Sequence, residues 1–230
     1  MNTTHNAPHK SAHRHTSSDD KLVTTYYQSV DYFHNNKRTV YIALGVVILI
    51  IAGIFFYNGR QSRFNEKAAV DVAKINPVYS AGNYAAAMNG DSLGNRGLIA
   101  IVNDYGSSEN GQLAKIMLAN CYFYTRNFDM AAKYFDDFGG SNKLLKVSAL
   151  AGIAGVKEAK NDYSSAAKDF EKAANYDKEN PFRDENLFNA GKNYFMANDK
   201  DNSKRVFDSI KKEYPKSKLI SQIARFNPEG

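Results

Sequence analysis

A long apolar run dominates the first third of the chain. Residues 39–57 read TVYIALGVVILIIAGIFFY and contain no charged side chain. At 1.5 Å per residue, a helix of this length spans about 28 Å, close to the roughly 30 Å hydrocarbon thickness of a bilayer. Tyr41 and Tyr57 lie near its two ends, where aromatic rings favour the membrane interface, and Lys37, Arg38 and Arg60 flank it. The pattern predicts a single transmembrane helix.

Two alternatives to a membrane span fit this run less well. A core helix of a soluble protein is seldom apolar on every face over more than about 10–14 residues. A cleavable signal peptide would lie closer to the first residue and would end in small side chains, whereas the run ends in Phe55-Phe56-Tyr57. We therefore expect residues 39–57 to remain in the protein as an anchor.

The polar segment before the run divides into two parts. Residues 1–21 carry almost no apolar side chain, which predicts a disordered tail. Residues 22–38 place apolar side chains at helical spacing, which predicts an amphipathic juxtamembrane helix, with Leu22, Tyr26, Val30 and Phe33 on one face. The histidines of the tail could hold a metal only loosely, and solubilising sequence explains them better: His5, His9, His13 and His15.

The chain after the run repeats one pattern three times, over residues 118–135, 153–170 and 190–207. In each copy a small residue precedes a second small residue by twelve positions, and a phenylalanine follows four positions later. The first small residues are Ala119, Ala154 and Gly191, the second are Ala131, Ala166 and Ser203, and the phenylalanines are Phe135, Phe170 and Phe207. Small residues let two helices approach closely, so the pattern predicts stacked helix pairs.

This pattern resembles the tetratricopeptide repeat, a helix–turn–helix unit of about 34 residues. Pro181 and Pro215 stand where the second helix of a unit must end. We therefore expect an all-α repeat domain over 58–230, with a degenerate unit and an inserted loop in front and a capping helix behind. The expected units cover about 62–104, 112–145, 147–181 and 184–217, the loop covers 89–97, and the cap covers 218–227. Pro77 is expected to interrupt the first helix of the degenerate unit.

Composition and charge leave little room for chemistry. The net charge of +6 comes from acids and bases that are mixed along the chain, without the basic block that nucleic acid would require. No histidine occurs after His34, and Cys121 is the only cysteine. Phosphate-cradling glycine loops and spaced catalytic acids are also missing from the sequence. We expect no enzyme activity, no cofactor, no metal and no small-molecule substrate.

The whole plan resembles one family. An amphipathic leader, one span and a small repeat domain beginning NGRQSRFNEKAA are similar to the YfgM-like ancillary Sec translocon subunits. The loop AMNGDSLGNRGLIAIVNDYG and the ending FDSIKKEYPKSKLISQIARF resemble membrane-anchored repeat proteins of the Bacteroidetes and Chlorobi type. The resemblance implies an inner-membrane protein with its amino terminus in the cytoplasm and its repeats in the periplasm. Charge counting around the span does not settle this topology by itself.

In tetratricopeptide arrays the first helix of each unit lines a concave face, and positions 2, 5, 9 and 12 of the unit face the ligand. Carried onto this chain, the resemblance implies a partner-binding set of Leu113, Ile116, Asn120, Phe123, Phe188, Lys192 and Phe195. The slots of the second unit are Ser148, Ala151, Gly155 and Glu158, so the middle of the groove is expected to be small. Such a groove would suit an apolar segment, with Phe123, Phe188 and Phe195 partly exposed. The alternative is that these rings pack against a neighbouring unit.

Two functions from different classes follow from these features. The resemblance implies an ancillary component of the translocon and periplasmic chaperone network, with protein partners or client segments, no nucleic acid, and the bilayer as its support. The alternative is a structural scaffold for the assembly of a cell-envelope complex. Capture of Sec subunits and a chaperone, or of a fixed set of envelope proteins, would separate the two.

Overall fold

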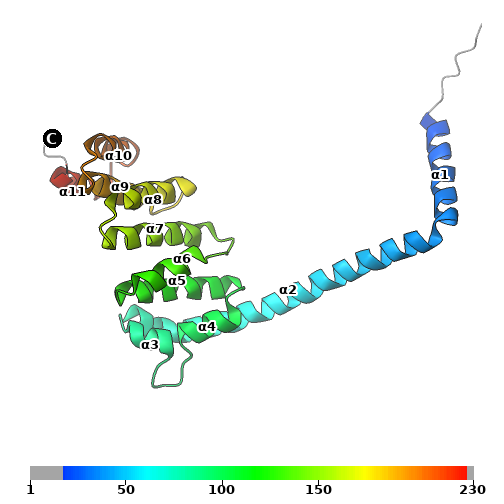
Figure 1. Ribbon diagram of the computed structural model, residues 1–230, viewed down its shortest axis with the longest axis horizontal. Coiled ribbons are helices and arrows are strands. Elements are labelled where there is room, and N and C mark those ends of the chain that lie inside the picture. The colour runs from blue at the N-terminus through cyan, green and yellow to red at the C-terminus, as the bar shows by residue number, and fades with distance from the viewer. Residues whose placement is uncertain (1–17, 227–230) are drawn as a thin grey trace, which may run out of the picture. The chain divides into compact units, whose positions relative to one another are not determined.

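The computed structural model describes residues 18–226, with side chains from residue 21 onward, as helices joined by turns and loops (Figure 1). The chain divides into two compact units that meet between Tyr57 and Asn58. The expected all-α class is confirmed. The helices are α1 (Ser18–Asn35), α2 (Lys37–Ser80), α3 (Tyr84–Asn89), α4 (Leu98–Tyr105), α5 (Glu109–Tyr124), α6 (Phe128–Asp136), α7 (Lys143–Ala159), α8 (Tyr163–Tyr176), α9 (Arg183–Met196), α10 (Lys200–Glu213), α11 (Ile220–Ile223) and a 3-10 helix η1 (Ala224–Phe226).

The first unit holds α1 and the apolar part of α2. Residues 1–17, most of the expected tail and four of the five histidines, lie outside the described residues, and α1 already begins at Ser18. The helix breaks at Asn36, so the expected juxtamembrane segment 22–38 consists of most of α1 and the first two residues of α2. Leu22, Tyr26 and Phe33 on α1 are exposed, and the ring centre of Phe33 lies 5.9 Å from that of Tyr41.

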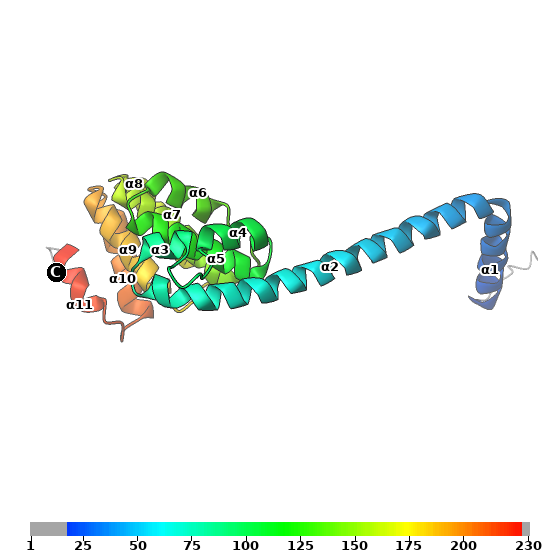
Figure 2. The same ribbon diagram turned by 90° about the horizontal axis from the view of Figure 1, so that it is seen from below.

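The apolar run lies in α2, which Figure 2 shows as one uninterrupted helix. Its most apolar stretch of 18 residues is not buried anywhere in the protein. Among the described residues, α2 alone is long and apolar enough to cross a membrane, judged by length and composition. Side chains such as Leu49 and Phe55 are more than two-thirds exposed. A helix with this surface needs an apolar environment around it.

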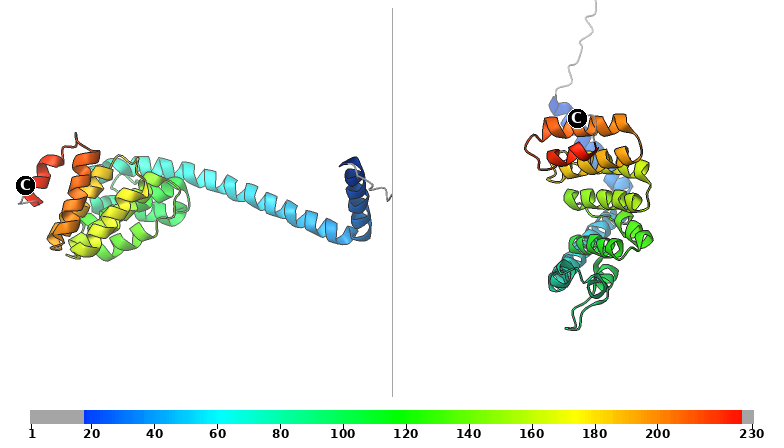
Figure 3. Two further views of the ribbon diagram at one scale, coloured as in Figure 1. Left: turned by 90° about the horizontal axis from the view of Figure 1, so that it is seen from above. Right: turned by 90° about the vertical axis from the view of Figure 1, so that its left-hand side faces the viewer.

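The second unit stacks its helices in chain order, as the right-hand view of Figure 3 shows. The pairs α5–α6, α7–α8 and α9–α10 contact each other within each pair and from pair to pair. The small residues lie where the two helices of a pair approach most closely. Ala119, Ala131, Ala154 and Ala166 are fully buried, and the Ser203 hydroxyl donates to the Gly191 carbonyl oxygen at 2.9 Å. A Cβ atom at Gly191 would lie 2.6 Å from the Phe207 ring, so this contact requires glycine.

The turn inside each pair has one repeated geometry. Arg126, Asn161 and Asn198 adopt the left-handed conformation, with φ of 63°, 62° and 60°. The next residue donates its N–H to the carbonyl oxygen five positions earlier, as in Asn127 to Tyr122, which is the Schellman arrangement that ends a helix. Asn127, Asp162 and Asp199 then cap the second helix, because their side chains accept from the N–H three residues later.

The same turn follows α2, which identifies the degenerate first pair. Gly82 has φ of 76°, Asn83 donates its N–H to the Val78 carbonyl oxygen, and the Asn83 side chain caps α3. The end of α2 therefore acts as the first helix of a pair, and it buries Ala68, Val72 and Ile75 against α3, α4 and α5. The second helix of this pair is split into α3 and α4.

Pro77 does not interrupt this first helix, contrary to the expectation. The helix continues to Ser80, and the Ala81 N–H still donates to the Pro77 carbonyl oxygen. Because Pro77 stands in the last turn, its missing N–H removes only one hydrogen bond, close to where the helix ends in any case.

The loop between α3 and α4 is fixed at its base. Gly90 and Arg96 form a β-bridge, and the Arg96 guanidinium pairs with Asp71 of α2 at 3.2 Å and with Asp104 of α4. It also donates to the Tyr105 hydroxyl at 2.9 Å. One arginine thus connects the loop to α2 and α4.

Candidate protein-binding groove

A groove runs across the first helices of the three regular pairs. Its lining comes from α5, α7 and α9, from the turn between α7 and α8 and the first residue of α8, and from η1 at the end of the described chain. The volume of the groove is about 520 Å³. The lining residues are Phe123, Gly155, Glu158, Ala159, Asn161, Tyr163, Asn189, Lys192, Met196 and Phe226.

The apolar part of the groove is built around Phe123. Its ring contacts Tyr124 and Phe128, each at 5.7 Å between ring centres, so it is half-buried and held in place. Gly155 faces it from α7, where an added Cβ would lie 3.7 Å from the ring. Met196, half exposed on α9, adds a flexible apolar side chain. A rigid ring beside a small residue leaves room for an apolar side chain of a partner.

In the polar part of the groove, the lysine charge is compensated by a carboxylate of the same chain. Lys192 of α9 pairs with Glu158 of α7 at 2.6 Å, and the Asn193 amide donates to the same carboxylate at 2.9 Å. Both bonds cross from one pair to the next, so they also fix the distance between α7 and α9. Because the lysine charge is already compensated, the groove has little to offer a carboxylate of a partner. It suits an uncharged segment better.

The structure places some of the predicted binding residues in or near the groove and others in the interior. Phe123 and Lys192 line the groove, and Phe195 is half-buried beside it. Leu113 is half-buried against the first pair, and the Asn120 amide donates to the Tyr79 hydroxyl at 3.1 Å.

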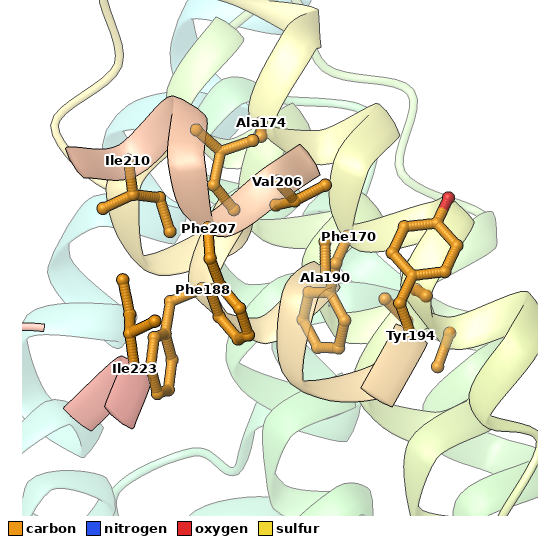
Figure 4. Close-up of a cluster of buried hydrophobic side chains, with 13 residues drawn as sticks. Phe170, Ala174, Phe188, Ala190, Tyr194, Val206, Phe207, Ile210 and Ile223 are labelled. Carbon is orange, nitrogen blue, oxygen red and sulfur yellow. The ribbon is translucent and has the colours of Figure 1, made fainter. Parts of the chain in front are cut away.

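Ile116 and Phe188 belong to the interior instead. Ile116 is 4% exposed in the cluster between α5 and α7, and Phe188 is 8% exposed in the last cluster (Figure 4). The expected partial exposure of Phe188 is therefore wrong, and its ring contacts are with Phe207 of its own pair and with Phe226 after that pair. The reason is that Phe188 points toward the core beside Phe207 and Ile223.

Six groove residues were not predicted, namely Ala159, Asn161, Tyr163, Asn189, Met196 and Phe226. Asn189 and Met196 each follow a predicted position by one residue, which is about 100° around the helix. The groove stripe on α9 is thus rotated from the expected stripe, while Lys192 belongs to both. Predicting this rotation would require knowing that α9 begins at Arg183. The sequence does not mark that start, because the residue before it has no capping side chain. Phe226 reaches the groove from a distant part of the chain, and no local pattern signals that.

Two candidate kinds of chemistry can be checked in the described residues, a cysteine nucleophile and a metal site. Cys121 is fully buried, and burial raises the pKa of its thiol to about 12, so the thiolate that would act as a nucleophile is not formed near neutral pH. Within residues 18–226, no group of three or more His, Cys, Asp or Glu side chains lies together in a way that could hold a metal ion.

Stacked helix pairs with a shared turn define a helix–turn–helix repeat protein. The family described as a tetratricopeptide repeat-like domain matches residues 31–184, and a tetratricopeptide repeat matches residues 185–217. The chain belongs to the tetratricopeptide repeat-like family, whose repeat domains typically mediate protein–protein interaction and are typically non-catalytic. Comparison with curated proteins and with solved structures gives no match.

Proposed function

We propose that this chain is a single-pass inner-membrane protein that binds protein partners through the groove between α5, α7 and α9. The observation that carries the proposal is the groove itself. It contains the Phe123 ring packed against Phe128, the small residue Gly155, and Lys192 with its charge compensated by Glu158. The long apolar helix α2 supports the anchor, because its most apolar stretch is not buried against any other part of residues 18–226.

Within this proposal, the partners are subunits of the Sec translocon, periplasmic chaperones or segments of emerging client proteins. The match over residues 31–184 includes the apolar helix together with the first repeats, which supports the resemblance to ancillary translocon subunits. The amino terminus then lies in the cytoplasm and the repeats lie in the periplasm. Protease added to spheroplasts should digest the region after Tyr57 and leave the amino-terminal tail intact, and the reverse pattern would invert the topology.

A groove cysteine provides the sharpest test of partner binding. Cys121 is buried and difficult to ionise, so the maleimide end of a photoactivatable crosslinker should react at neutral pH only with an introduced cysteine. We would use Gly155→Cys, because a Cβ there meets Phe123 at an ordinary contact distance of 3.7 Å. The matched control is Tyr176→Cys, at the end of α8 and outside the groove, where half of the side chain is exposed.

Photo-activation in intact membranes should then join Gly155→Cys, and not Tyr176→Cys, to its partners. Sec subunits together with a periplasmic chaperone are the expected products. A fixed set of other envelope proteins would favour the second candidate, a scaffold for envelope assembly, which the groove geometry serves equally well. Equal products from both positions would show that the groove is not the binding surface.

A further inference from the structure

The residues 219–226, called here the C-terminal segment, cover part of the apolar face of α9. The segment consists of the four-residue helix α11 and the three-residue 3-10 helix η1, preceded by Leu219. Ile223 is 1% exposed and enters the last core cluster beside Phe188, Phe207 and Ile210 (Figure 4). This segment therefore takes the place where the first helix of a further pair would stack.

Phe226 places an aromatic ring over two of the predicted binding positions. Its ring centre lies 5.9 Å from that of Phe188 and 5.9 Å from that of Phe195. It also stacks on Phe207 at 6.3 Å, and it forms one wall of the groove. The chain thus presents its own phenylalanine to the surface that the tetratricopeptide pattern assigns to a partner.

Among the described residues, the contacts of the C-terminal segment with α9 and α10 are apolar. Within residues 18–226, its hydrogen bonds go to its own residues or to the adjacent Lys218 and Ser217, as in Leu219 N–H to the Ser217 hydroxyl. Four of its eight residues are exposed: Ser221, Gln222, Ala224 and Arg225. The adjacent Ser217 hydroxyl donates to the Asp184 carboxylate of α9 at 2.7 Å, so the described residues 219–226 can lift from α9 while this polar contact at their base stays in place.

The segment also leaves space on both sides. The groove of about 520 Å³ lies on one side of it, and Phe226 of the segment forms part of the groove wall. A second hollow of about 480 Å³ is lined by Phe188 and Asn189 of α9 and by Leu219 and Gln222 of the segment. The lining of this hollow is mixed, since Asp184, Glu185 and Lys218 also border it, so an amphipathic helix longer than α11 could cover its apolar and polar residues together.

We propose that the C-terminal segment is a displaceable internal ligand, and that the partner of this surface is an amphipathic helix that replaces it. The apolar residues of the segment recur at i, i+1, i+4 and i+7, namely Leu219, Ile220, Ile223 and Phe226. A partner helix with this spacing fits by the helix-in-groove mode. The proposal rests on the proposed function, because it names the class of partner and the regulation of the same groove.

The test uses the full chain in detergent micelles and a fluorescent peptide that copies residues 217–226. The variant Ile223→Ser/Phe226→Ser releases the internal ligand and frees the surface. Because the unchanged chain is mostly in the occupied state, its apparent affinity for the peptide is reduced by the fraction that is open. We expect the variant to bind the peptide at least about tenfold more tightly than the unchanged chain does. Leu93→Ser, in the exposed loop after α3, is the control and should bind like the unchanged chain.

Two results would overturn the inference. One is a variant that keeps its helical circular dichroism and does not bind the peptide. The other is binding of a peptide in which serine replaces the residues corresponding to Ile223 and Phe226. If the variant instead loses its helices, hydrogen exchange of the unchanged chain decides, because excess peptide should speed exchange at residues 219–226 and not in α10. Unchanged exchange would refute displacement, whereas crosslinking from Gly155→Cys would still report on the groove.

Discussion

Gly152 and Gly155 lie one turn apart on α7, and alanine should have opposite effects at the two positions. A Cβ atom at Gly152 would lie 2.4 to 2.6 Å from three atoms of the Phe135 ring, whose side chain is 2% exposed. At Gly155 the nearest atom of the Phe123 ring would be 3.7 Å away, in a half-open groove. The same helix therefore holds one glycine that packing requires and one that it does not.

The magnitudes follow from two competing terms. Alanine is more favourable than glycine inside a helix by about 0.8–1 kcal/mol, and this gain applies at both positions. Forcing an extra carbon into a packed core costs about 1–3 kcal/mol, and this term applies only at Gly152, since the buried Phe135 ring has nowhere to move. Gly155→Ala should then stabilise the protein by about 0.5–1 kcal/mol, while Gly152→Ala should destabilise it by about 1 kcal/mol.

Thermal unfolding of the full chain in detergent, followed by far-UV circular dichroism, measures both effects. About 1 kcal/mol corresponds to about 2–4 °C for a chain of this size, so the two variants should differ by several degrees around the unchanged chain. In a Phe135→Leu background the ring is gone, and Gly152→Ala should no longer be destabilising. Stabilisation by Gly152→Ala in the unchanged background would refute the close packing of α6 against α7.

Three further predictions test other parts of the fold. Phe170→Ala should destabilise the protein by about 3–5 kcal/mol in urea unfolding, because this ring is 5% exposed in the last cluster. Lys157→Ala should change stability by under about 1 kcal/mol, because Lys157 forms a solvent-accessible ion pair with Asp169. Arg126→Gly should raise the melting point, since glycine adopts φ near 63° without strain, and an unchanged or lower melting point would contradict this. Burial raises the pKa of the Cys121 thiol from 9.0 to about 12, so its contribution to stability is complete below pH 9 and is lost as the pH rises toward 12; a thiol reagent at pH 8 should not modify the folded chain.

The sequence is sufficient to predict the parts of this fold that depend on periodic side chains. The apolar run and the small residues at intervals of twelve each depend on one residue type at a fixed spacing, and both correspond to observed elements. Ala119 and Ala131, for example, are fully buried as close helix packing requires. Such patterns can be recognised in a single sequence, because the spacing along a helix decides which side chains share one face.

The rotation of the groove could not be predicted in the same way. A spacing rule gives the residues of one helical stripe, but a shift of one residue turns the stripe by about 100° and exchanges core for surface. Phe188 and Asn189 show this, since one is 8% exposed in the core and the other lines the groove. The contact of Phe226 with Phe188 joins segments 38 residues apart, and only the folded chain brings them together.

The repeated Schellman turn makes the second unit divisible into exchangeable parts. The turns at Asn83, Asn127, Asp162 and Asp199 share one backbone hydrogen bond, from the N–H of this residue to the carbonyl oxygen five positions earlier, so we expect the turn to set the direction in which each second helix leaves it. The added loop of residues 90–97 occurs after such a turn, so it lengthens the first pair without shifting those that come later. Chimaeras that join α3, α6, α8 or α10 to a different first helix at this corner should therefore keep the stacking order, and the groove could be altered one pair at a time.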